Sequence, residues 1–141
     1  MEITVQNDQK TLRLNLKNIK ALALAVLKLL KQPKNTFVSI SFVSKAKIRK
    51  LNRQYFRKNR VTDVIALEYK KNDSFYKDYL GDIIIAPEIA KSNAAIYGVK
   101  FSDELSLYVI HGILHLLGYD DTTAALKKRI EKKQQEIIAS L

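Results

Sequence analysis

Apolar side chains recur at intervals of three and four residues in several stretches of the chain, the pattern of amphipathic helices. The first stretch covers residues 15–31 and predicts a helix packed on a core. A second helix is expected after Ser44, whose hydroxyl can cap the first turn. The residues that this second helix should turn inward are Ile48, Leu51 and Tyr55.

Three further helices are predicted in the C-terminal half. Pro87 suits the first turn of a helix that ends at Gly98. The next helix is expected to be capped by Ser102 and to end at Gly118. Because it is apolar nearly all round, it should be buried in the fold. The last helix covers residues 122–139, and its inward residues are Leu126, Ile130 and Ile137.

Alternating apolar and polar residues predict a strand over 36–43 and a weaker one over 2–6. Two more strands are expected over 64–69 and 82–86, separated by a polar loop over 70–79. The strand over 82–86 is nearly all isoleucine, so it should be central and buried. This order of elements predicts an α+β (mixed α/β) fold with a single sheet of about four strands flanked by helices.

Composition narrows the possible classes of protein. With 141 residues and 47% hydrophobic content, residues 1–141 are expected to form one domain. The absence of cysteine excludes disulfides and cysteine-bound metals, so any transition metal must rest on His, Asp or Glu. The N-terminus lacks the pattern of a secretory signal, and no apolar run approaches the roughly 20 residues of a membrane span. A cytoplasmic protein without a membrane partner is therefore expected.

The net charge of +11 favours a polyanionic partner such as RNA or an acidic membrane surface. Residues 45–60 contain eight basic side chains and no acidic one. Such a run is often a solvated helix face; here it is also a candidate RNA-backbone site, with Tyr55 or Phe56 available for base stacking. The basic side chains of this segment, called the basic segment below, are Lys45, Lys47, Arg49, Lys50, Arg53, Arg57, Lys58 and Arg60.

Both histidines of the chain, His111 and His115, lie four residues apart on the helix expected to be buried, so they project from one face. Asp121 follows the turn at Gly118 and can return to supply a third ligand. Three ligands and an open position are typical of catalytic zinc. The alternative is a pair of hydrogen-bonded core histidines. Gly112 between them argues against it, because glycine inside a helix costs about 1 kcal/mol relative to alanine.

Around these residues the sequence resembles a known family. The stretch HGILHLLGYDD, residues 111–121, resembles the signature H-G-x-x-H-L-x-G-Y-D-H of the YbeY endoribonucleases. The third ligand of that signature is its final histidine, which is Asp121 here. A carboxylate can bind the same metal, although it adds negative charge and so changes the preference among metals.

The resemblance extends over residues 37–121. Leu51-Asn52, Tyr55 and Thr62-Asp63-Val64 resemble the family segment L-N-x-x-Y-R-G-x-D-x-P-T-D-V, and Gly81-Asp82-Ile83 resembles its G-D/E-I strand. The segment also departs from the pattern: Phe56 replaces an arginine implicated in activity, and Val61 replaces the proline. Arg57, one position later, is the candidate substitute for the missing arginine.

The resemblance implies a single-strand-specific, metal-dependent endoribonuclease of 16S ribosomal RNA 3′-end maturation and ribosome quality control. It also implies one zinc per chain on a zincin-like two-histidine helix at the active cleft. Its partners would be single-stranded RNA, the small ribosomal subunit and assembly factors such as an Era-type GTPase. In this interpretation His111, His115 and Asp121 bind the metal, and Arg57 neutralises charge on the phosphate. Asp120 either orients a ligand or accepts a proton from bound water, or else it fixes the turn.

Two other functions stay open. A metallopeptidase can share the histidine spacing, but the glutamate that serves as general base in the H-E-x-x-H peptidases is replaced by Gly112. A non-catalytic RNA-binding or ribosome-assembly factor with a structural metal is consistent with Phe56 and Asp121. In that case, removing the metal would change stability and leave RNA binding intact.

Overall fold

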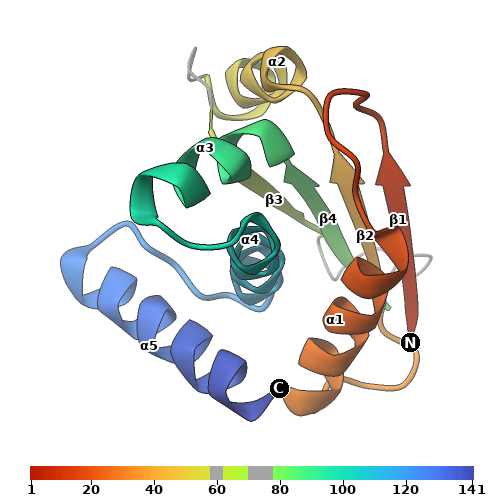
Figure 1. The fold of residues 1–141 in the computed structure, drawn as a ribbon. Coiled ribbons are helices and arrows are strands. Elements are labelled where there is room, and N and C mark those ends of the chain that lie inside the picture. The colour runs from red at the N-terminus through yellow and green to blue at the C-terminus, as the bar shows by residue number, and fades with distance from the viewer. Residues whose placement is uncertain (58–61, 70–77) are drawn as a thin grey trace.

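The computed structural model of the chain describes residues 1–57, 62–69 and 78–141. These residues form five helices and one four-stranded sheet (Figure 1), which confirms the α+β class and the single sheet. The strands are β1 (Glu2–Asn7), β2 (Phe37–Phe42), β3 (Val64–Glu68) and β4 (Tyr79–Ile85). The helices are α1 (Leu16–Leu29), α2 (Lys45–Phe56), α3 (Pro87–Tyr97), α4 (Phe101–Leu116) and α5 (Ala124–Ser140).

The strand order in the sheet is β1-β2-β4-β3, with β1, β2 and β4 parallel and β3 antiparallel at one edge. β4 is an interior strand and its Ile83 and Ile85 are fully buried, as the run of isoleucines predicted. The strand begins at Tyr79, earlier than expected, because Tyr79 pairs with Phe37 of β2 and their ring centroids lie 4.6 Å apart. Residues 70–77 of the expected loop lie outside the described part of the chain.

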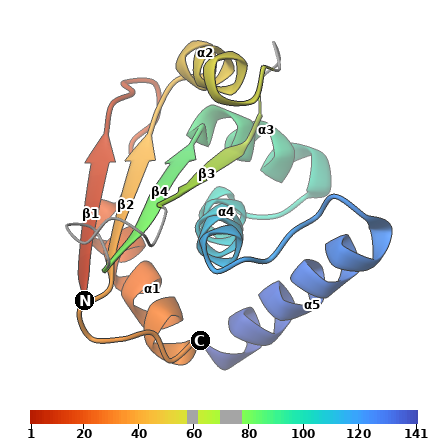
Figure 2. The ribbon, with the colours of Figure 1, turned by 180° about the vertical axis from the view of Figure 1, so that it is seen from behind.

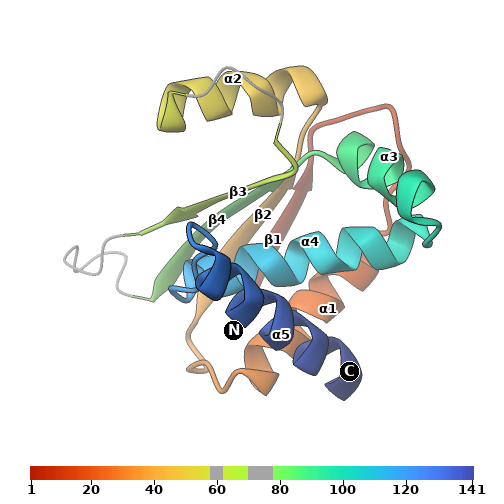
Figure 3. The same cartoon turned by 90° about the vertical axis from the view of Figure 1, so that its left-hand side faces the viewer.

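The sheet is covered on both faces (Figure 3). Successive side chains of a strand point to opposite faces, so Ile83 and Ile85 of β4 pack in the main core with α1 and α4. Ile84 faces the other way and packs with Ile48 of α2. Helix α2 therefore covers the face opposite to α4. This second, smaller cluster consists of Val43, Ile48, Leu51, Ile65, Leu67, Ile84, Ala86 and Ile89.

Helix α4 is buried, as its apolar composition predicted. Figures 1 and 2 show it end-on, enclosed by the sheet, α1, α3 and α5, and it contacts all of them. At Gly112 the helix approaches β4 closely, since an added Cβ would lie 2.5 Å from Cγ2 of Ile83. The glycine that costs helix stability is thus the one that lets α4 pack on the sheet.

Helix α4 begins at Phe101, so the expected cap at Ser102 is wrong. Lys100 is the N-cap and makes no side-chain cap hydrogen bond. Phe101 packs against the main core, which draws the chain into the helix before Ser102. Ser102 lies in the first turn, and its carbonyl accepts a hydrogen bond from the hydroxyl of Ser106 at 2.8 Å.

Helix α2 is capped by Ser44, whose hydroxyl accepts from the backbone N–H of Lys47 at 3.2 Å, as predicted. Ile48 is fully buried and Leu51 partly so, but the expected inward position of Tyr55 is wrong, because its side chain is 52% exposed. The axis of α2 diverges from the sheet toward its C-terminal end (Figure 3). The last turn therefore has no strand beneath it to bury Tyr55.

Candidate metal centre

The side chains of His111, His115 and Asp121 converge on one point. The Nε2 atoms of the two histidines lie 2.9 Å apart, and Oδ2 of Asp121 lies 3.8 Å from the first and 3.6 Å from the second. Tetrahedral zinc with ligands at about 2.0–2.2 Å places ligand atoms about 3.3–3.6 Å from one another. The observed distances bracket this value. The group could therefore hold one metal ion.

Local structure brings the three side chains together. One turn of α4 separates the two histidines, whose ring centroids lie 4.4 Å apart. Gly118 then adopts a positive φ of 97°, and the backbone N–H of Tyr119 donates to the carbonyl of Leu114 at 3.0 Å. This turn reverses the chain so that Asp121 faces the histidines.

The centre is open on the side of the carboxylate. The side chains of His111 and His115 are 26% and 24% exposed, whereas that of Asp121 is 44% exposed. Three protein ligands with one accessible side leave room for a water molecule or a substrate oxygen in the fourth position. An open fourth position is typical of catalytic sites, whereas structural sites are closed by a fourth protein ligand.

The electrostatics of the centre favour the metal-binding form of His111. Burial lowers the pKa of His111 below its usual 6.5, and the charge of His115 lowers it further. The carboxylates of Asp63, Asp121 and Glu131 act in the opposite direction without reversing the shift. The lowered pKa favours the neutral imidazole, which is the form that can bind a metal.

Asp120 faces the turn. Its carboxylate accepts hydrogen bonds from the backbone N–H of Asp121 at 2.7 Å, the N–H of Thr122 at 3.2 Å and the hydroxyl of Thr122 at 3.0 Å. The first of these bonds is the main reason that the pKa of Asp120 is lowered. These contacts are those expected of a residue that fixes the turn and so holds the segment carrying Asp121.

Sequence reasoning missed Gln134 of α5. Its side chain is only 6% exposed, and its amide is in hydrogen-bond contact with Nδ1 of His111. The available signal was its spacing, because Gln134 lies between Ile130 and Ile137 on the inward stripe of the helix. A polar residue on such a stripe needs a buried partner.

The basic side chains along α2 do not lie next to the metal centre. Lys45, Lys47, Arg49, Lys50 and Arg53 are exposed on α2, on the face of the sheet opposite to α4. Their exposure leaves them accessible to a large ligand. Tyr55 and Phe56, 52% and 46% exposed, lie at the end of the same helix. Lys58 and Arg60 lie outside the described residues.

Arg57 ends α2 in an unusual conformation. It is the C-cap, with φ 55° and ψ 29°, the left-handed region that favours glycine. The only other non-glycine residue with positive φ among those described is Lys31, at φ 56°. In the family segment to which this stretch is similar, the position of Arg57 is a glycine.

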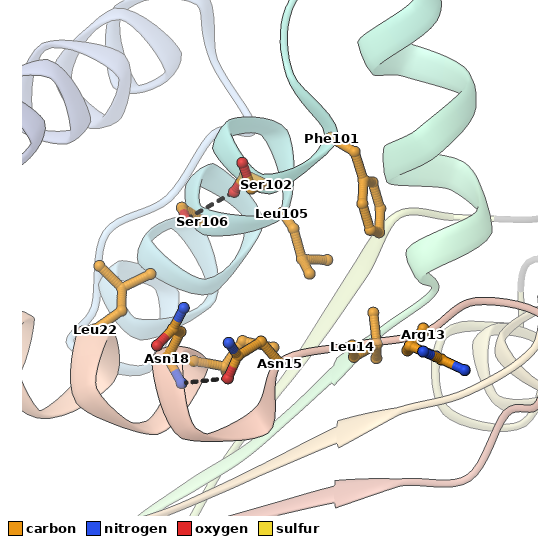
Figure 4. A pocket seen from close by; sticks show the side chains of 10 residues that line it. Arg13, Leu14, Asn15, Asn18, Leu22, Phe101, Ser102, Leu105 and Ser106 are labelled. Atoms are coloured by element: carbon orange, nitrogen blue, oxygen red, sulfur yellow. Dashed lines mark hydrogen bonds between the residues drawn. The ribbon is translucent and has the colours of Figure 1, made fainter.

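A cavity of about 250 Å³ lies between the start of α1 and the start of α4 (Figure 4). Leu14 faces Phe101 and Leu105 across it, and polar side chains such as Asn18 and Ser106 complete its lining. The cavity is somewhat smaller than typical small-molecule sites, which occupy roughly 300–1,000 Å³. None of the candidate metal ligands lines it.

The family model described as Endoribonuclease YbeY matches residues 4–141. The chain belongs to the YbeY endoribonuclease family. A YbeY relative from Thermodesulfovibrio yellowstonii, named Endoribonuclease YbeY, is 38% identical over 112 residues, which are 79% of this chain and 70% of the relative. One of the same name from Staphylococcus carnosus is 43% identical over 106 residues, 72% of this chain and 69% of the relative.

The fold agrees with a solved structure. A solution structure of a Thermotoga maritima protein superposes with a TM-score of 0.61 and 27% identity, covering 98% of this chain and 90% of that one.

In the described part of this YbeY chain, no helix is long and apolar enough to cross a membrane.

Proposed function

We propose that this protein is a metal-dependent endoribonuclease that hydrolyses single-stranded RNA. The observation that carries the proposal is the convergence of His111, His115 and Asp121 at an open site in a YbeY chain. The proposed substrate is 16S ribosomal RNA near its 3′ end, in rRNA maturation and ribosome quality control in the cytoplasm. The proposed partners are the small ribosomal subunit and assembly factors such as an Era-type GTPase, and the proposed cofactor is one zinc per chain.

A bound divalent metal would lower the pKa of its water and polarise a phosphoryl oxygen. The residues of this chain determine what surrounds that chemistry. His111 and His115 hold two positions with neutral nitrogens, and Asp121 adds a carboxylate, which reduces the net positive charge of the centre. Asp120 holds the turn that brings Asp121 into place and is also a candidate acceptor of the proton released by the water.

The basic side chains of α2 support RNA binding on the face of the sheet opposite to α4. β3 is an edge strand and contacts α4, so the proposed RNA path runs from α2 around β3 toward the metal centre. The exposed cations Arg49, Lys50 and Arg53 would contact phosphates along this path, and Tyr55 would stack on a base. Arg57 is the candidate for neutralising charge on the phosphate that reacts.

A second function is favoured by one observation. Asp121 stands where the family signature has histidine, which is consistent with an RNA-binding assembly factor whose metal is structural. A metallopeptidase is less well supported, because Gly112 occupies the position of the peptidase base and packs against Ile83 of the sheet.

The test of the proposed function is metal content by mass spectrometry together with cleavage of a single-stranded RNA. Wild type should carry about one metal per chain and cleave, and His115→Ala should lose both properties. Ser102→Ala, an exposed change on the same helix, is the matched control and should behave as wild type. Stoichiometric metal without cleavage would favour the assembly factor, and absence of metal from wild type would overturn the proposal.

The RNA path is tested by charge reversal. Arg53→Glu with Arg57→Glu should weaken binding and reduce the slope of log affinity against log salt by about 0.7 for each lost phosphate contact. Lys17→Glu with Lys20→Glu on exposed positions of α1 makes the same change in net charge. An unchanged salt slope in the first pair, or an equal loss in both pairs, would refute the assignment of the basic segment.

A further inference from the structure

Gln134 interrupts the apolar face of α5. Ile130 and Ile137 on either side are each 1% exposed, and Gln134 is 6% exposed. Burying an amide without a hydrogen bond is unfavourable, so this position destabilises the fold unless the amide has a partner. The partner is Nδ1 of His111, which lies 23 positions earlier in the chain on α4.

The two ring nitrogens of His111 face different groups. Nε2 faces His115 and Asp121, whereas Nδ1 faces Gln134. A neutral imidazole carries its proton on one nitrogen, and the group that contacts one nitrogen decides which. For Nε2 to bind a metal, Nδ1 must carry the proton and donate it to an acceptor.

The amide of Gln134 can be that acceptor. In the structure its Nε2 lies against Nδ1 of His111, and a half-turn of the amide brings Oε1 to the same place. A glutamine can therefore contact His111 in either tautomer, as a donor when Nδ1 is bare and as an acceptor when Nδ1 is protonated. The carboxylate of Asp120, by contrast, accepts from the backbone and side chain of its own turn.

We infer that Gln134 is a positioning residue for the metal centre, whose amide oxygen accepts the Nδ1 proton of His111 and so directs the lone pair of Nε2 toward His115 and Asp121. This inference rests on the proposed function, because it assigns a partner to one of the proposed ligands. Gln134 acts through His111 and contacts neither the metal nor the RNA. Fixing the ring and its tautomer in advance reduces the cost of assembling the site.

Zinc affinity of the purified protein, measured by competition with a chelating dye, is the first readout. Gln134→Met keeps the length of the side chain and removes its hydrogen bond, and it should weaken zinc binding by about 10–100-fold. Gln134→Glu keeps an acceptor and should restore binding to at least the wild-type level. Gln135→Met, on the neighbouring exposed position, should bind as wild type. Equal affinity of Gln134→Met and wild type would overturn the inference.

Nitrogen NMR of the histidine ring in the metal-free protein is the second readout, and it does not depend on the metal. The ring-nitrogen signals of His111 should shift in Gln134→Met toward those of a free imidazole and stay unchanged in Gln135→Met. Identical His111 signals in wild type and Gln134→Met would overturn the inference. If wild type bound no zinc, the proposed function would fail, and these signals would still decide whether Gln134 holds His111.

Discussion

Arg57 holds a left-handed conformation that an arginine adopts only at a cost. With φ 55° it forms the C-cap of α2, and its N–H donates to the carbonyl of Arg53 at 3.0 Å. For a residue with a Cβ, the left-handed conformation is less stable than the right-handed one by roughly 1–2 kcal/mol. Glycine avoids this strain but loses about 0.5–1 kcal/mol more backbone entropy on folding. Arg57→Gly should therefore stabilise the protein by about 0.5–1 kcal/mol.

The same variant should lose function, because a residue that holds a sparsely populated backbone conformation at a proposed site is a candidate for a role in that site. RNA cleavage should fall by about 10²-fold, the lower end of what removing one charge-stabilising donor costs. Arg57→Ala keeps the strain and removes the cation, so it should cleave as poorly without the gain in stability. Urea unfolding and single-turnover RNA cleavage measure the two effects separately.

Lys31 provides the matched control. Its φ of 56° is almost the same, and it follows the end of α1 rather than α2. Lys31→Gly should gain similar stability and cleave RNA as wild type. If Arg57→Gly is no more stable than wild type, the strain argument is wrong. If Arg57→Gly cleaves normally, or Lys31→Gly loses as much activity, Arg57 has no special role in the reaction.

Three further outcomes are expected. Gly112→Ala should destabilise the protein by about 1–3 kcal/mol in urea unfolding, because the new Cβ meets Ile83, and the loss should shrink when Ile83→Ala is added. Asp121→His should keep one metal per chain by mass spectrometry, whereas Asp121→Ala should bind the metal more weakly. Equal metal affinities of wild type and Asp121→Ala would show that Asp121 is not a ligand. Burial raises the pKa of Tyr108 to about 12, so above its unfolded pKa of about 10 the native state retains a proton that the unfolded chain loses. Above that pH the free energy of unfolding should fall by up to about 1.4 kcal/mol per pH unit. Urea unfolding of Tyr108→Phe should show a weaker dependence on pH, and an unchanged dependence would contradict the raised pKa of Tyr108.

The elements of this fold follow from short-range patterns. Intervals of three and four residues predicted the helices, and the apolar run at residues 82–86 predicted an interior strand, because periodicity decides which face of an element can be buried. Short-range spacing also predicted the pairing of His111 with His115, since one helical turn places both on one face. Asp121 needed only the turn at Gly118 to join them.

Tertiary structure alone decided the features that depend on contacts between distant segments. Packing of Ile48 on the far face of the sheet separates α2 and its basic side chains from α4, and the divergence of α2 from the sheet exposes Tyr55. The contact of Gln134 with His111 joins two helices across a loop, and Gly112 is explained only by the nearness of Ile83. Spacing along the chain determines which residues share a face, but the partner that each face meets depends on how all the elements pack together.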